Sequence, residues 1–296
     1  MWFQKPRRPN QEAAPAEAHY EATDADKPDA QPPSPSFVQG APHGEPSKLA
    51  LGAPNLLPEV RVWNEQIAQF KPDWRHLAHN LVICPGAPSG VVSAYNLLRT
   101  EALKRLRQNH WNTVAVTSPS RVSGNTLTAF NLAISMARDF GQSVLLVELN
   151  LVTPSFHRIL GLGQRQGVAD YLLYDASLSE IQLDIGVERL AVIPAGSPVA
   201  NSSELLSSPR MAQFVEEIRG RHGRLIALFD LPSVLAVDAA AAFSPLVDCA
   251  LLVVEEGETR VDDVRRALRH LEATKILGIV LNRSIHGENE IGVISR

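Results

Sequence analysis

The order of apolar segments along the chain constrains its fold more than any other feature of the sequence. From Val91 on, short continuous apolar runs alternate with segments that have the spacing of amphipathic helices. Continuous apolar runs are typical of strands buried on both faces, and intervening helices are typical of parallel crossovers. We therefore predict an α/β fold, with a mostly parallel sheet and helices on both of its faces. The expected strands are 113–118, 143–149, 189–196, 224–232, 249–257 and 276–283. The expected helices are 93–110, 125–140, 155–162, 167–174, 209–221, 237–243 and 261–274.

The two ends of the chain have a different composition from this regular part. Residues 1–60 hold eleven of the 21 prolines and show no apolar periodicity, which predicts a disordered segment. Its simplest role is a tether, and the alternative is a docking segment for a partner. We expect 61–90 to be a linker that packs in part, 91–285 to be the folded domain, and 286–296 to be a short tail without tyrosine.

Charge and cysteine content exclude several classes of function. The formal net charge of −4 gives no field that would attract nucleic acid. Two cysteines cannot build a disulfide framework or a four-cysteine metal site. The N-terminus has basic residues without a following apolar run, and the most apolar later stretch is interrupted by Asp and Pro. We expect a cytoplasmic protein that reaches the inner membrane only through a partner.

The stretch SPSRVSGNT (118–126) has the outline of a phosphate-binding loop between a strand and a helix. Such a loop needs glycines, the helix N-terminus, a lysine for the outer phosphates and a hydroxyl for Mg²⁺. Gly124 and Thr126 supply a glycine and the hydroxyl, whereas Asn125 stands at the lysine position and carries no charge. Arg121 is a possible substitute cation, although an arginine there is also typical of a solvated loop.

Three further polar positions fall at the carboxyl ends of expected strands, where ligands bind in parallel sheets. Glu148 and Asn150 lie two residues apart and are expected to point to the same side. Glu148 is a candidate base or partner of a magnesium-bound water, whereas Asn150 cannot take a proton. Asp230 ends a buried strand and is a candidate Mg²⁺ residue; the alternative is that it caps the following turn, which Pro232 favours.

From about Pro72 to Arg283 the chain resembles the cytoplasmic domain of the bacterial tyrosine autokinases of capsule and exopolysaccharide synthesis. The stretches that carry the resemblance are TAFNLA (128–133), SVLLVELNLVTPSFHRILGL (143–162), GVADYLLYDASLSEI (167–181), LAVIPAGSPVANSSELLSSPRM (190–211), LIALFDLPSV (225–234), VDAAAAFSPLVDCALLVVEEGETR (237–260) and LGIVLNR (277–283).

This resemblance implies a P-loop fold of the MinD/ParA-like class, with ATP or ADP and Mg²⁺ as ligands. Gly124, Asn125 and Thr126 would surround the phosphates, Asn282 would contact the base, and Thr126 and Asp230 would serve Mg²⁺. The resemblance also implies homo-oligomers and a partner, the cytoplasmic face of a membrane polysaccharide co-polymerase.

The departures from the family pattern all fall at residues that serve function in the family. Asn125 replaces the lysine, and Glu148, Asn150 and Val152 stand where the family has DxDxR. The helix that drives ring assembly in the family keeps only Arg99, since Ser93 and Asn96 fill its other positions. No tyrosine cluster ends the chain.

We therefore predict a pseudokinase, a regulatory or scaffold component of polysaccharide synthesis. One alternative is an active ATPase or tyrosine kinase that uses Arg121 and Glu148 instead of the missing groups. A second is a MinD/ParA-type positioning protein, although the tail is too short and polar for a membrane helix.

Overall fold

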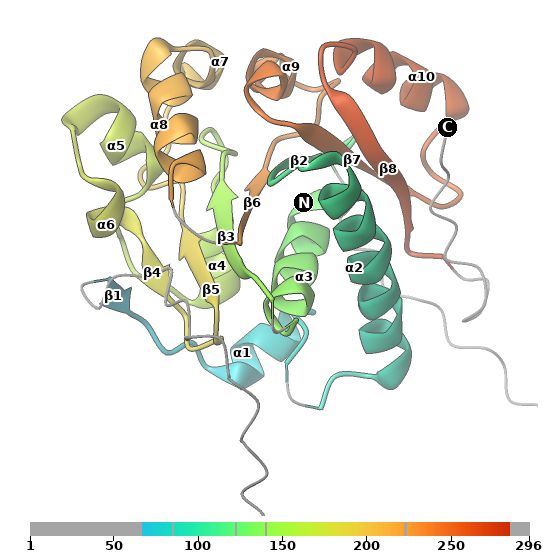
Figure 1. Cartoon of the computed structure of the whole chain (residues 1–296), viewed down its shortest axis with the longest axis horizontal. Coiled ribbons are helices and arrows are strands. Elements are labelled where there is room, and N and C mark those ends of the chain that lie inside the picture. The colour runs from blue at the N-terminus through green and yellow to red at the C-terminus, as the bar shows by residue number, and fades with distance from the viewer. Residues whose placement is uncertain (1–66, 85, 122, 140, 222–223, 285–296) are drawn as a thin grey trace, which may run out of the picture. The chain divides into compact units, whose positions relative to one another are not determined.

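The computed structural model describes residues 67–84, 86–121, 123–139, 141–221 and 224–284, so the predictions for 1–60 and 286–296 lie outside the described residues. Within the described part, eight strands form one sheet in the order β1-β4-β5-β3-β6-β2-β7-β8 (Figure 1). The strands are β1 (Ala68–Gln69), β2 (Thr113–Thr117), β3 (Ser143–Glu148), β4 (Leu183–Asp184), β5 (Leu190–Ile193), β6 (Leu225–Asp230), β7 (Cys249–Glu255) and β8 (Lys275–Asn282).

The sheet is mostly parallel, as the sequence predicts. Among the described strands, only β4 and β5 pair antiparallel. The register of β3 against β6 places Glu148 directly beside Asp230. Parallel pairing therefore brings these two carboxyl groups together at the carboxyl edge of the sheet.

Helices cover both faces of the sheet because the strand side chains alternate between two apolar clusters. Val114 and Val116 face one cluster, whereas Ala115 between them faces the other. The first face carries α1 (Trp74–His79), α2 (Ser89–Asn109), α3 (Asn125–Ala137) and α4 (Phe156–Leu160). The second face carries α5 (Val168–Tyr174), α6 (Leu178–Ile181), α7 (Ser202–Leu206), α8 (Pro209–Arg219), α9 (Ala239–Phe243), the short 3-10 turn η1 (Ser244–Leu246) and α10 (Val261–His270).

Several helices differ in extent from the sequence expectations. α2 begins four residues earlier than expected, directly after its N-cap residue Pro88. α3, α8 and α10 end two to four residues earlier than expected, because the apolar spacing continues beyond the helix, and α9 begins two residues later than expected. The folded unit also begins before Val91, since β1 pairs with β4 and α1 packs its buried Leu77 in the first cluster.

A buried asparagine fastens the segment after α1 to the domain. The Asn131 Oδ1 atom accepts a hydrogen bond from the Ile83 N–H at 2.8 Å, and its Nδ2 atom donates to the Leu81 carbonyl at 3.1 Å. Asn131 and Ile83 are both almost wholly buried. The side chain thus satisfies one buried N–H and one carbonyl of this irregular backbone.

Replacing Asn131 by alanine should therefore lower the free energy of unfolding by about 2 kcal/mol, because it leaves a buried N–H without an acceptor. Urea denaturation measures this loss. Asn109→Ala removes an exposed asparagine from the end of α2 and should change stability by less than about 0.5 kcal/mol. Equal losses in the two variants would contradict the anchoring role of Asn131.

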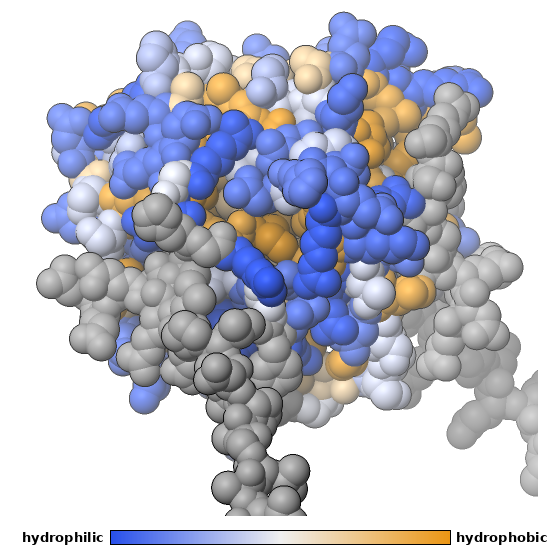
Figure 2. Space-filling model, in the orientation of Figure 1, coloured by the Kyte–Doolittle hydropathy of each residue, from blue (hydrophilic) through white to orange (hydrophobic). Residues whose placement is uncertain are grey.

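The outer sides of the helices are mainly hydrophilic on the face that Figure 2 shows, with smaller apolar areas between them. None of the helices in the described ranges combines the length and the apolar character that crossing a membrane requires.

Candidate nucleotide-binding site

The predicted phosphate loop lies at the carboxyl edge of the sheet, between β2 and the N-terminus of α3. Gly124 is the N-cap of α3 and has a φ of 80°, a left-handed conformation that favours glycine. A Cβ atom at this position would lie 2.4 Å from the Asn282 Nδ2 atom. The left-handed conformation therefore favours glycine here, and a larger residue would also displace the Asn282 side chain.

Asn125, at the lysine position, points into the protein and is almost wholly buried. Its Nδ2 atom donates to Asp230 Oδ1 at 3.0 Å and to the Leu231 carbonyl at 2.7 Å. Its Oδ1 atom accepts a hydrogen bond from the Ser118 hydroxyl at 3.2 Å. The side chain thus links the start of α3 to the end of β6 and presents no positive charge to a phosphate.

The loop is held by its own serines and by β8. The Ser118 hydroxyl donates to the Ser120 carbonyl at 2.7 Å, and the Ser120 and Ser123 hydroxyls lie 2.8 Å apart. Asn282, which the family resemblance assigns to the base, donates from Nδ2 to the Ser123 carbonyl at 2.9 Å. In this arrangement Asn282 anchors the loop, and its contact with a base stays a prediction.

Glu148 has no exposed surface, and described donors engage both of its carboxylate oxygens. Oε1 accepts from the Ser155 N–H, from the Ser155 hydroxyl at 3.1 Å and from the Phe156 N–H at 2.9 Å. Oε2 accepts from the Ala195 N–H at 3.1 Å. Burial raises the pKa of Glu148, and these donors oppose the rise. The carboxylate therefore ties together the segments that follow β3 and β5.

Asp230 is wholly buried and only partly satisfied. Asn125 donates to Oδ1, whereas Oδ2 accepts no hydrogen bond of ordinary geometry from a described residue. Burial raises the pKa of Asp230 well above its usual range; the Thr126 and Asn125 side chains oppose this shift, and the charge of Glu148 adds to it. Two adjacent buried carboxyl groups, with no cation beside them in the described part of the chain, favour the protonated form of Asp230.

A cavity of about 540 Å³ opens beside the start of α3. It is lined by Asn80, Arg121, Gly124, Asn125, Thr126, Leu127, Asn150, Thr153, Pro154, Ser155, His157, Arg158, Ile159 and Arg283. The structure thus brings together four of the predicted residues, Arg121, Gly124, Asn125 and Thr126. Asn150 lines the cavity as well, while its Oδ1 atom accepts from the Thr153 N–H at 3.3 Å.

Glu148 and Asn150 lie two residues apart, but only Asn150 lines the cavity. Asn150 belongs to the cavity wall, whereas the carboxylate of Glu148 is drawn inward by the N–H groups of Phe156 and Ala195. Sequence spacing places the two backbones correctly, but buried donors from other segments determine the direction of Glu148.

The cavity fits the phosphates of a nucleotide better than it fits Mg²⁺. Its volume lies within the usual range of small-ligand sites, and the first turn of α3 points N–H groups toward it. Mg²⁺ needs carboxylates or other oxygen ligands at its coordination distance. Thr126 offers a hydroxyl, but neither Glu148 nor Asp230 is among the lining residues. No described cluster of three or more His, Cys, Asp or Glu could hold a metal ion. The residues present do not fit Mg²⁺.

Sequence reasoning missed two arginines of this cavity. Arg158 lies in α4, within the quoted SFHRILGL stretch, and Arg283 follows β8. The placement of α4 directly after the Glu148 segment was the available signal for Arg158. Arg283 lies more than 150 residues from Arg121 in the sequence, so only the sheet order brings it here.

Arg99, the predicted assembly residue, makes contacts within its own chain. Its Nη1 atom donates to the Ser135 carbonyl at 3.3 Å, and the neighbouring Asn96 Oδ1 accepts from the Ser135 hydroxyl at 3.2 Å. Both contacts join α2 to α3. A role of Arg99 in oligomers stays a prediction.

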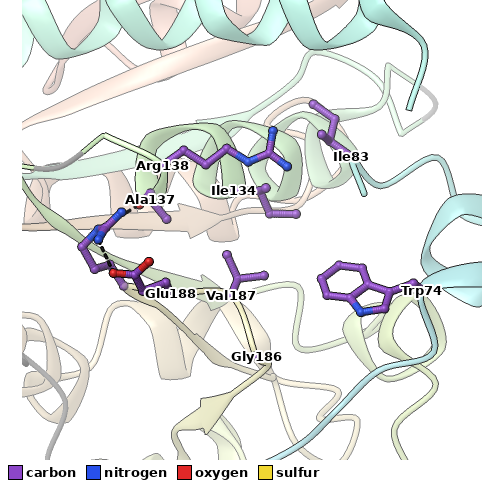
Figure 3. A pocket seen from close by; sticks show the side chains of 9 residues that line it. Trp74, Ile83, Ile134, Ala137, Arg138, Gly186, Val187 and Glu188 are labelled. Atoms are coloured by element: carbon purple, nitrogen blue, oxygen red, sulfur yellow. Dashed lines mark hydrogen bonds and ion pairs between the residues drawn. The ribbon is translucent and has the colours of Figure 1, made fainter. Parts of the chain in front are cut away.

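A second, smaller cavity of about 230 Å³ lies at the opposite edge of the sheet, near the start of β5 (Figure 3). Trp74 borders it on one side and Glu188 on the other, with Ile134 and Val187 between them and Arg138 above. None of the predicted site residues lines this cavity.

No protein-family model matches the chain. It is 29% identical over 190 residues to the tyrosine-protein kinase YwqD of Bacillus subtilis, a match that covers 64% of this chain and 79% of YwqD. It is 32% identical over 188 residues to the succinoglycan biosynthesis transport protein ExoP of Rhizobium meliloti, a match that covers 62% of this chain and 23% of ExoP. The chain therefore spans less than a quarter of the length of that relative.

Among solved structures, the kinase domain of the Escherichia coli tyrosine kinase ETK superimposes with a TM-score of 0.62 at 26% identity. That match covers 69% of this chain and 80% of the ETK chain. The cell division ATPase MinD of Pyrococcus furiosus gives a TM-score of 0.50 at 20% identity, which shows the fold alone. The chain is thus a homologue of the bacterial tyrosine-protein kinases and has the P-loop fold of their kinase domains.

Proposed function

We propose that this chain is a kinase-like protein without phosphoryl-transfer activity, a regulatory or scaffold component of exopolysaccharide or capsule biosynthesis and export. The observation that carries the proposal is the buried amide of Asn125, which takes the lysine position and bonds to Asp230 and Leu231. Phosphoryl transfer depends on fixed positive charge at the outer phosphates. An inward-facing amide supplies none.

The state of the two carboxyl groups supports the same conclusion. A general base or a metal ligand needs an ionised oxygen within reach of the substrate. The carboxylate oxygens of Glu148 accept hydrogen bonds from four donors of its own chain. Asp230 is buried, and its pKa is raised. The chain keeps the fold of a kinase domain, whereas the side chains that would take part in phosphoryl transfer form hydrogen bonds within the protein.

The relatives support the proposed setting. One is named as a succinoglycan biosynthesis transport protein, and the matched part is 23% of its length. We place this chain with a separate membrane partner, the cytoplasmic face of a polysaccharide co-polymerase, at the inner membrane. Removing the protein should then change the amount or chain length of the extracellular polysaccharide, and the wild-type gene should restore it.

Turnover of ATP is the direct test. The full chain with ATP and Mg²⁺ should release phosphate at least about a thousandfold more slowly than an active kinase, for which about 1–100 s⁻¹ is typical. It should also form no phosphotyrosine. The kinase domain of E. coli ETK, assayed in parallel, is the positive control. Asn125→Lys should not restore turnover, because Glu148 stays engaged with its donors.

The competing function is an active kinase that uses Arg121 as its cation. The position of Arg121 in the cavity wall favours it, because a guanidinium there lies on the same side as Thr126. Magnesium-dependent turnover that Arg121→Ala and Asp230→Ala both abolish would establish this alternative and remove the proposal.

A further inference from the structure

Among the described residues, basic side chains line the cavity beside α3 and no acidic residue does. Its described wall includes three arginines and one histidine, and neither Asp nor Glu. Phosphate-binding sites share this character, because guanidinium groups match phosphate oxygens in charge and shape. A P-loop site that uses Mg²⁺ also needs carboxylates, which this wall lacks.

Two of the three arginines are available to a ligand. Arg121 and Arg158 are exposed, and no ion pair or hydrogen bond of either side chain occurs within the described residues. Arg283 differs, because it forms an ion pair with Glu255. The uncompensated positive charge of the cavity therefore comes from Arg121 on the loop and Arg158 on α4.

Backbone donors add to this charge. The Thr128 N–H donates to the Gly124 carbonyl at 2.9 Å, which makes it the first helical hydrogen bond of α3. The N–H groups of residues 125–127 precede it and have no acceptor within the helix. Gly124, Asn125, Thr126 and Leu127 all line the cavity. The two arginines and the N-terminus of α3 therefore border the same cavity, although they belong to separate elements.

We infer that this cavity is a metal-independent phosphate site, in which Arg121 and Arg158 take the place of both Mg²⁺ and the loop lysine. Its ligand is a free diphosphate group, as in pyrophosphate or a nucleoside diphosphate. The inference rests on the proposed function, because a site that only holds its ligand needs no metal to activate it. The lining residues do not fit Mg²⁺, and in this inference the site therefore binds its ligand without that ion.

Calorimetry on the full chain tests this inference with pyrophosphate, ADP and UDP as probes. Each titration is done in excess MgCl₂ and again in excess EDTA, at constant ionic strength. At least one diphosphate should bind, with dissociation constants that agree within about threefold between the two solutions. Arg121→Gln and Arg158→Gln should each weaken binding about tenfold or more, the effect of losing one charge-assisted contact.

Arg138→Gln is the matched control. Arg138 is also an exposed arginine, but it lines the second cavity at the opposite edge of the sheet (Figure 3), so its loss should leave binding unchanged. Equal binding of pyrophosphate and ADP would show that the phosphates alone are recognised. Tighter binding of ADP or UDP than of pyrophosphate would show that the base contributes.

Two results would overturn the inference. One is an affinity that rises tenfold or more with Mg²⁺, and the other is no binding of any of the three probes in either solution. Neither result would by itself restore catalysis, so the proposed function would stand until turnover was measured. ATP turnover together with metal-independent diphosphate binding would contradict the proposed function and support the inferred phosphate site.

Discussion

Replacing Glu148 by alanine should lower the free energy of unfolding by about 4 kcal/mol, a large share of the 5–15 kcal/mol that is typical of folded domains. The carboxylate accepts hydrogen bonds from the N–H groups of Ser155, Phe156 and Ala195. Phe156 and Ala195 are wholly buried, so their N–H groups would lose their partner without gaining water. An unsatisfied buried donor costs about 1–3 kcal/mol.

Two matched variants test whether the loss of stability comes from the buried N–H groups that Glu148 accepts from. Glu148→Gln keeps one acceptor oxygen and turns an amide N–H₂ toward the remaining donors, so it should lose about half as much stability. Glu180→Ala removes a carboxylate that also accepts from a backbone N–H, that of Ser177, but on the exposed surface, and its effect should be much smaller. Urea denaturation of the three variants gives the order. A Glu148→Ala protein as stable as the wild type would show that Glu148 does not anchor the segments after β3 and β5.

Replacing Asp230 by asparagine should raise stability at neutral pH by about 2 kcal/mol and flatten its dependence on pH. A buried carboxylate without a cation is costly, whereas an amide of the same shape is not charged. The pKa of Asp230 is raised in the folded protein, chiefly by burial. Its contribution to stability is therefore complete below the unfolded pKa of about 3.9, and it is lost as pH rises through the folded pKa.

The wild-type protein should accordingly lose stability as the pH rises from about 4, and Asp230→Asn should lose less. Glu148 contributes in the same direction because its pKa is raised as well, so some slope remains. Asp248 is the opposite case. Burial alone would raise its pKa, but the N–H groups of Asn112 and Thr113, the Thr113 hydroxyl and the Arg219 guanidinium hold it below its usual value.

Asp248→Asn should therefore lower stability at neutral pH, and the wild-type advantage, complete above the unfolded pKa, should be lost as the pH falls through the lower folded pKa. Thermal unfolding measured across the pH range distinguishes the two aspartates. If Asp230→Asn destabilised the protein at neutral pH, Asp230 would be ionised and compensated by a group that the described residues do not include.

The sheet could be predicted from the sequence because its central strands are continuous apolar runs. SVLLVE and LIALFD are buried at every position, and that pattern needs helices on both faces. The two-residue strands β1 and β4 could not be predicted, since two residues show no periodicity. They exist because the segment before α1 pairs with β4 at the edge of the sheet.

The site could be located from the sequence, but its side-chain directions could not. The loop, Glu148 and Asp230 lie where the ends of parallel strands place them. Whether Asn125 faces the cavity or the core depends on Asp230 and Leu231, more than a hundred residues away. The direction of a polar side chain is determined by the partners that satisfy it when it is buried.

The internal bonding of Asn125 limits how readily a descendant of this protein could acquire a cationic loop. A lysine at position 125 would remove the amide that now donates to Asp230 and to the Leu231 carbonyl, and the Ser118 hydroxyl would keep only the Ser120 carbonyl as an acceptor. That single substitution removes buried hydrogen bonds before any charge reaches a ligand. Acquiring a catalytic loop would therefore require a less stable intermediate sequence. Selection for folding stability alone is enough to keep position 125 uncharged.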